Sequence, residues 1–170
     1  ARFNDWTLQV LEPCSVTAAS LVNTDPASPS LWLGCSDGTV WMYYESDEAW
    51  LGSDIEEATL GEGTVRAIHS VSEELAYAVF EPVDDANVQV ISIDLETGTP
   101  GAAVSTYFSK YTDSVVSTNR IIISHDEYKV STFNTSGSLG NYTSVVTSMD
   151  ADDMTLDTVY GAYLLDAGEG

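Results

Sequence analysis

Two short apolar runs separated by an Asp-Gly pair form the clearest pattern in the chain. Leu31 to Cys35 and Val40 to Tyr44 flank Asp37-Gly38, and this pair favours a tight hairpin turn because Gly adopts positive φ without a Cβ clash. Neither run alternates apolar with polar residues, which is typical of strands that are buried on both faces. The sequence therefore predicts a β-hairpin with protein packed against each face.

The same design recurs twice along the chain. Runs at 75 to 80 and 88 to 93 flank a turn around Asp84-Asp85, and runs at 120 to 124 and 129 to 133 flank a turn around Asp126-Glu127. Another strand-like run precedes each hairpin, at 16 to 22, 65 to 71 and 115 to 118, and a fourth lies at 158 to 165. The first valines of these runs, at positions 16, 65, 115 and 159, are 49, 50 and 44 residues apart.

A repeat of this length resembles the four-stranded blades of β-propellers of the WD-repeat type. The hairpin at 31 to 41 carries the resemblance most clearly, although no Gly-His or Trp-Asp dipeptide stands in any copy. The resemblance implies a scaffold of stacked blades that binds other macromolecules. We predict one all-β domain of consecutive four-stranded antiparallel blades, with an irregular β-sandwich as the alternative. The expected blades are approximately 16–58, 64–108 and 114–148, with terminal strands at 7–11 and 158–165.

This strand count falls short of the four or more blades of a closed ring. We therefore expect the terminal strands, other chains or further parts of a longer polypeptide to complete it. Whether the chain is a whole protein or a segment stays open.

The charge changes the picture of possible partners. Five Lys and Arg residues stand against 27 Asp and Glu residues, a formal net charge of −22, which repels phosphate backbones and argues against nucleic-acid binding. There is also no run of eighteen apolar residues, so no membrane insertion is predicted. Solubility, a basic partner protein or bound Ca²⁺ are the explanations left for the acidic excess.

Two acidic segments are candidate sites. The first surrounds Trp50 and is predicted to face a basic partner; the alternative is a solvated outer strand with Trp50 packed against its blade. Its residues are Trp50, Asp47, Glu48, Asp54, Glu56 and Glu57. The second could supply oxygen ligands to Ca²⁺, although it lacks the EF-hand spacing and also suits a solvated linker. Its residues are Asp150, Asp152 and Asp153.

The chain shows no catalytic motif, such as a Gly-x-Ser-x-Gly elbow or a His-Glu-x-x-His pair, so we predict no catalytic residues and no cofactor besides possible Ca²⁺. His69 lies in an apolar strand and is expected to be a hydrogen-bonded core residue. His125 lies at a turn and is expected to be exposed. If Val22 pairs with Leu31, Cys14 lies too far from Cys35 for a disulfide; a slipped register would bring the two cysteines together.

These observations favour a non-enzymatic protein-interaction or structural module, with virion or cell-surface assemblies as plausible settings. A fragment of a propeller enzyme and a Ca²⁺-binding extracellular adhesion module are the alternatives. Asn134 and Asn141 match the N-glycosylation pattern, which matters only in a secreted setting. The compartment stays open.

Overall fold

The computed structural model of the 170-residue chain describes eleven ranges, and statements below about absent features refer to these ranges alone. They are residues 14–22, 30–44, 55–72, 74–84, 86–95, 97–117, 119–125, 129–135, 142–146, 153–157 and 161–165. Every regular element in them is a β-strand. No helix there is long and apolar enough to cross a membrane.

Twelve strands form three four-stranded antiparallel sheets, each following the chain order without a crossover. The first sheet contains β1 (Val16–Val22), β2 (Ser30–Cys35), β3 (Thr39–Tyr44) and β4 (Ile55–Thr59). The second contains β5 (Gly63–Ser70), β6 (Leu75–Pro82), β7 (Gln89–Asp94) and β8 (Pro100–Ser105). The third contains β9 (Asp113–Ser117), β10 (Arg120–His125), β11 (Lys129–Asn134) and β12 (Tyr142–Val146).

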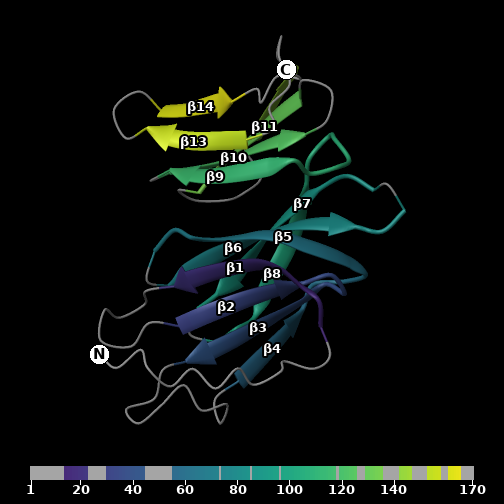
Figure 1. The fold of residues 1–170 in the computed structure, drawn as a ribbon, viewed down its shortest axis with the longest axis vertical. Helices are drawn as coiled ribbons and strands as arrows, with labels where there is room; N and C mark the ends of the chain where they lie inside the picture. Colours follow the sequence, from purple (N-terminus) through teal and green to yellow (C-terminus); the bar gives the residue numbers. More distant parts are fainter. Residues whose placement is uncertain are drawn as a thin grey trace.

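The three sheets follow one another along the long axis of the molecule, and a two-stranded sheet of β13 (Asp153–Asp157) and β14 (Gly161–Leu165) follows the third (Figure 1). The first strands of successive sheets are neighbours: β1 lies beside β5, β5 approaches β9, and β9 lies beside β13. No strand of one sheet is interleaved into another. The predicted all-β fold of consecutive four-stranded antiparallel sheets is therefore confirmed, and their stacking is consistent with a blade-like or a sandwich arrangement.

The second sheet shows why its strands lack a polar face. Along β6, Ala76, Ala78 and Phe80 belong to one buried cluster, which also contains Trp32 of the first sheet. The intervening Tyr77 and Val79 belong to a second cluster, shared with the third sheet. Because successive side chains of a strand point to opposite faces, β6 is covered by a neighbouring sheet on each side. An unbroken apolar run is the sequence signature of that position.

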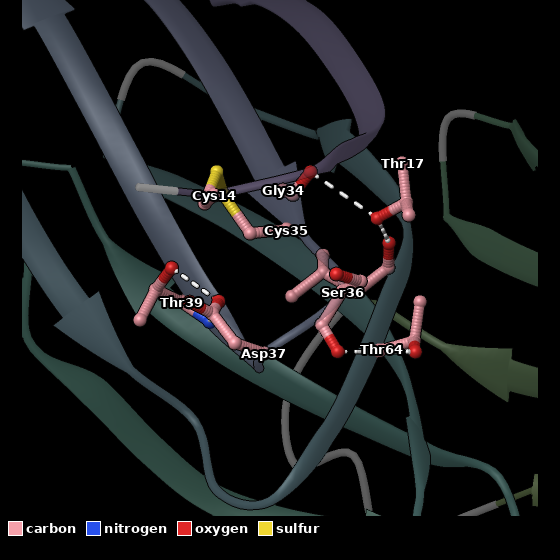
Figure 2. Close-up of a disulfide and its surroundings, with 9 residues drawn as sticks. Cys14, Thr17, Gly34, Cys35, Ser36, Asp37, Thr39 and Thr64 are labelled. Atoms are coloured by element: carbon pink, nitrogen blue, oxygen red, sulfur yellow. Dashed lines mark hydrogen bonds between the residues drawn. A yellow bond between two sulfur atoms is a disulfide. The ribbon is translucent and has the colours of Figure 1, made fainter. Parts of the chain in front are cut away.

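Close packing between the first two sheets depends on a residue without a side chain. A Cβ on Gly34 would lie 2.4 Å from Cγ1 of Val65, nearer than real carbon contacts. Beside it, the Thr17 hydroxyl donates to the carbonyl oxygen of Val65 at 2.6 Å and lies 3.2 Å from that of Gly34 (Figure 2). The sheets therefore meet through backbone contact as well as through apolar side chains.

The register with Val22 opposite Leu31, which would keep the two cysteines apart, is wrong, and the strands adopt a slipped register. Cys14 and Cys35 form a disulfide with a Cα–Cα distance of 5.7 Å (Figure 2). Val22 pairs with Ser30 rather than with Leu31, and a bulge after Val16 removes one further step of register. Val16, not Ala18, therefore lies opposite Cys35, which brings Cys14 within reach.

The C-terminal strands also differ from the sequence-based prediction. The segment expected as a solvated linker contains β13, paired with β14 from Asp153↔Leu165 to Asp157↔Gly161. β14 lies within the terminal strand expected at 158–165, whose first three residues lie outside the described residues. Acidic residues at both ends of β13 obscured the strand pattern in the sequence. In the structure, pairing with β14 provides hydrogen-bond partners for the backbone groups of β13. The other expected terminal strand, at 7–11, lies outside the described residues.

Candidate binding cavity

A cavity of about 470 Å³ opens at one end of the first and second sheets, beside the link to the third. It is formed by the β2–β3 turn, the start of β5, the end of β6 with its following turn, and the β8–β9 link. In a meander of antiparallel strands these segments share one end of each sheet. The lining residues are Ser36, Gly63, Thr64, Arg66, Glu81, Pro82, Val83, Asp84, Ala86, Lys110 and Tyr111.

One wall of the cavity is the β2–β3 turn of the first sheet. Gly38 has φ +83°, the positive value that its Asp-Gly sequence predicted. Asp37 stabilises the turn because its Oδ1 accepts hydrogen bonds from the Thr39 amide at 3.1 Å and hydroxyl at 2.7 Å; the hydroxyl bond also holds the pKa of Asp37 below its usual value. Figure 2 shows the turn meeting β5, where the Thr64 hydroxyl donates to the Ser36 carbonyl oxygen at 3.4 Å.

An ion pair between Arg66 and Glu81 lines the cavity. Nε of Arg66 donates to Oε2 of Glu81 at 2.5 Å, and Nη2 lies 2.5 Å from the same oxygen. The other carboxylate oxygen accepts the backbone N–H of Tyr111 at 3.3 Å. The Arg66 side chain is 42% exposed, whereas that of Glu81 is 17% exposed. A pair this exposed adds little stability, but it fixes the orientation of the guanidinium.

Two lining residues have an uncommon backbone conformation. Asp84 has φ 66° and Lys110 has φ 64°, and no other described residue except glycine has positive φ. This left-handed conformation costs a residue with a Cβ roughly 1 kcal/mol or more, and such residues cluster at functional sites. Both therefore keep a charged side chain at the cavity where glycine would be less strained.

The β8–β9 link that carries Lys110 is held by the third sheet. His125, whose ring is fully buried, places Nδ1 2.9 Å from the Lys110 carbonyl oxygen and Nε2 3.0 Å from the Ser131 hydroxyl. A carbonyl oxygen only accepts, so Nδ1 carries a proton. The ring of Phe108 packs edge-on against the imidazole at 5.3 Å. The prediction that His125 is exposed is therefore wrong, because the link folds back over it.

Tyr111 connects the cavity to a polar network between the second and third sheets. Its Oη lies 3.0 Å from the Ser114 hydroxyl, which lies 2.8 Å from Nε2 of His69. Burial lowers the pKa of His69 to about 4 and raises the pKa of Tyr111 to about 12. Both side chains are therefore neutral near pH 7, and His69 is the hydrogen-bonded residue that its apolar strand predicted.

The serine hydroxyls near the cavity are already engaged in hydrogen bonds. The Ser131 hydroxyl beside His125 is fully buried, so a substrate does not reach it, and the Ser114 hydroxyl is committed to His69 and Tyr111. No group of three or more His, Cys, Asp or Glu side chains is placed to hold a metal ion within the described ranges. The charged side chains that line the cavity include Arg66, Asp84 and Lys110, and all three residues are exposed.

The candidate site residues that the sequence singled out and the structure describes do not line this cavity. Glu57 is exposed on β4, and Glu56 lies on the same strand opposite Met42. Asp153 begins β13. Asn134 is exposed at the end of β11. The remaining candidates lie outside the described residues, namely Asp47, Glu48, Trp50, Asp54, Asn141, Asp150 and Asp152.

The cavity residues were missed because they come from four separated segments. One signal did exist: with five Lys and Arg residues in 170, each cation is conspicuous, and Arg66 and Lys110 both line this cavity. Their proximity follows from the stacking of the sheets, and no spacing in the sequence encodes it.

No protein-family model and no curated protein sequence matches this chain. In contrast, 66 chains of solved structures match its fold. The computationally designed Ika8 protein matches with a TM-score of 0.62 at 13% identity, over 84% of this chain and 40% of its own. The tricorn protease matches with a TM-score of 0.56 at 12% identity, over 86% of this chain and 14% of its own.

The likeness shows the fold alone. At these identities the residues of a site cannot be carried over, and the chain spans well under half the length of either protein. A third match, apo AztD from Citrobacter koseri, has a TM-score of 0.33 at 11% identity, over 79% of this chain and 47% of its own, too low to support an argument.

Proposed function

We propose that this chain is a non-enzymatic binding module of the β-propeller type, resembling WD-repeat blades, that binds another protein chain at the end of its sheets. One observation carries the proposal: the two described residues other than glycine with left-handed backbones, Asp84 and Lys110, line the same cavity as the oriented Arg66. Strain of this kind persists where the surrounding structure enforces it and function uses it.

The setting that we propose is an extracellular, cell-surface or virion assembly. The Cys14–Cys35 disulfide supports an oxidising compartment, since reducing compartments keep such thiols free. The acidic segment around Trp50 stays a predicted second contact, for a basic surface of the same partner. A net charge of −22 disfavours nucleic acid as that partner.

The composition of the chain makes a direct test possible. Lys110 and Lys129 are its only lysines, so an amine-reactive, photo-activated cross-linker attaches at these two side chains and at the N-terminal amine. Lys129 lies on β11, with its ammonium 5.6 Å from the centre of the Phe108 ring. The labelled full chain is mixed with candidate partners, illuminated, and mapped by mass spectrometry.

We expect partner adducts to form mainly through Lys110 and to persist in the control variant Lys129→Arg. Adducts formed mainly through Lys129 would place the partner elsewhere. Partner binding without any adduct at Lys110 would contradict the proposed binding surface.

A further inference from the structure

Arg66 lines the cavity, and one hydrogen-bonding edge of its guanidinium has no partner among the described residues. Its Nε and Nη2 groups both approach Oε2 of Glu81, while Nη1 has no partner among the described residues. Nη1 and the second N–H of Nη2 together form the outer edge of a planar guanidinium, which presents two parallel donors. Because Glu81 is in turn held by the Tyr111 amide, this edge is oriented before any ligand arrives.

Two parallel N–H donors match the two oxygens of a carboxylate. The cavity also contains Lys110, and these two residues are two of the five cations of the whole chain. Glu81 and Asp84 line the same space, so the local charge is close to zero on a protein of −22. This balance suits a monoanion better than a phosphate dianion, since each nearby carboxylate repels the second charge.

We propose that this cavity is a carboxylate-binding subsite, in which Arg66 receives the acidic side chain or the C-terminal carboxylate of a partner polypeptide. The inference rests on the proposed function and names the chemistry that the partner supplies. Glu81 is a positioning residue, because it acts through Arg66. Lys110 contributes a second positive charge from a backbone conformation that the His125 hydrogen bond maintains.

The test is an NMR titration of the full chain at constant ionic strength. The probes are N-acetyl-glutamate N-methylamide, its neutral glutamine counterpart, N-acetyl-alanine with a free carboxylate, and inorganic phosphate. The observed signals are the Arg66 Nε–H and the Tyr111 backbone N–H. We expect saturable shifts with a carboxylate probe and none with the glutamine probe; the alanine probe separates a C-terminal carboxylate from an acidic side chain.

Three variants test whether carboxylate binding depends on Arg66 and Lys110. Arg66→Gln should weaken carboxylate binding about tenfold or more, as expected when charge-assisted hydrogen bonds are removed. Arg120→Gln removes the same charge at an exposed position on β10 and should leave the affinity unchanged. Lys110→Gly should weaken binding severalfold while the melting temperature holds or rises, because glycine relieves the left-handed strain.

Several outcomes would overturn the inference. These are no saturable shift, tighter binding of phosphate than of carboxylate, equal losses in Arg66→Gln and Arg120→Gln, and unchanged binding in Lys110→Gly. A failed titration with successful cross-linking through Lys110 would reject the carboxylate while keeping the proposed partner surface. Failure of both would reject the proposed function as well.

Discussion

Single residues in this chain take their roles from the sheet that packs over them. His69 and His125 are both hydrogen-bonded to serine hydroxyls, yet only His69 lies in an apolar run that predicted a hydrogen-bonded side chain. His125 stands beside charged residues at a turn and is nevertheless covered by the β8–β9 link. A local pattern therefore predicts the environment of a residue within an apolar strand better than that of a residue at the end of a strand, where a connecting segment covers it.

The pKa of His69 predicts a loss of stability in mild acid. Its pKa is about 4 in the folded chain and about 6.5 when unfolded, so below pH 6.5 the unfolded state binds a proton that the folded state does not. The contribution of His69 is therefore complete above pH 6.5 and is lost as the pH falls towards 4. Since the residue is partly exposed, we expect a loss of at most about 2 kcal/mol between pH 7 and pH 5.

Urea unfolding of the wild type and of His69→Gln across this range measures the effect. The variant should lose this part of the pH dependence, while the titration of the many carboxylates stays common to both proteins. Parallel stability curves for the two proteins between pH 7 and pH 5 would show that His69 titrates normally.

At the scale of elements, the pairing of β1 with β2 decides the chemistry of the cysteines. Strand positions from 16 to 22 and from 31 to 35 follow from the apolar pattern, but a bulge beside Thr17 does not. The hydroxyl of Thr17 bonds to the Val65 carbonyl oxygen of the next sheet, so a tertiary contact accompanies the irregularity. A shift of two residues in the pairing of β1 with β2 therefore decides whether the cysteines stay free or form a disulfide.

Loss of the disulfide should destabilise the chain by about 3 kcal/mol, because the crosslink joins residues with a sequence separation of 21 and so restricts the unfolded state. The double variant Cys14→Ala/Cys35→Ala, compared with the wild type by urea unfolding, measures this difference. Alanine is chosen because Cys35 is fully buried.

Dithiothreitol provides the control. It should lower the stability of the wild type by a similar amount and leave the double variant unchanged. Two free thiols titrated in the denatured, unreduced protein would show that no disulfide had formed.

At the scale of the whole molecule, self-repulsion opposes the compact state. With a net charge of −22, we expect the melting temperature to rise with NaCl, since the Debye length falls from about 10 Å at 0.1 M to about 3 Å at 1 M. Thermal melts over this range measure the effect. A melting temperature that does not change with salt would refute the repulsion argument.

The same melts test the predicted Ca²⁺ site at Asp150, Asp152 and Asp153. Millimolar CaCl₂ at constant ionic strength should stabilise the chain by binding the folded state. MgCl₂ is the matched control for divalent charge, and an equal shift with both salts would remove the site.

The sequence by itself determined most of the strands, the three hairpins and their order in blades. These features depend on local patterns: apolar runs, a turn glycine at position 38, and a repeat length close to that of a blade. The apolar runs and the turn glycine act within a few residues, and the repeat length is the spacing between them. All three can therefore be recognised in the sequence without knowledge of the fold. They did not reveal β13, whose acidic ends obscure it.

Only the tertiary structure decided the disulfide, the burial of His125 and the cavity. Arg66, Glu81 and Lys110 stand on separate segments, and they meet because stacked meanders bring the same ends of their strands together. The physical reason is the range of the contacts involved. Strand formation depends on the local pattern of side chains. The strand register, the burial of His125 under the β8–β9 link and the pairing of charges depend on contacts between residues distant in the chain.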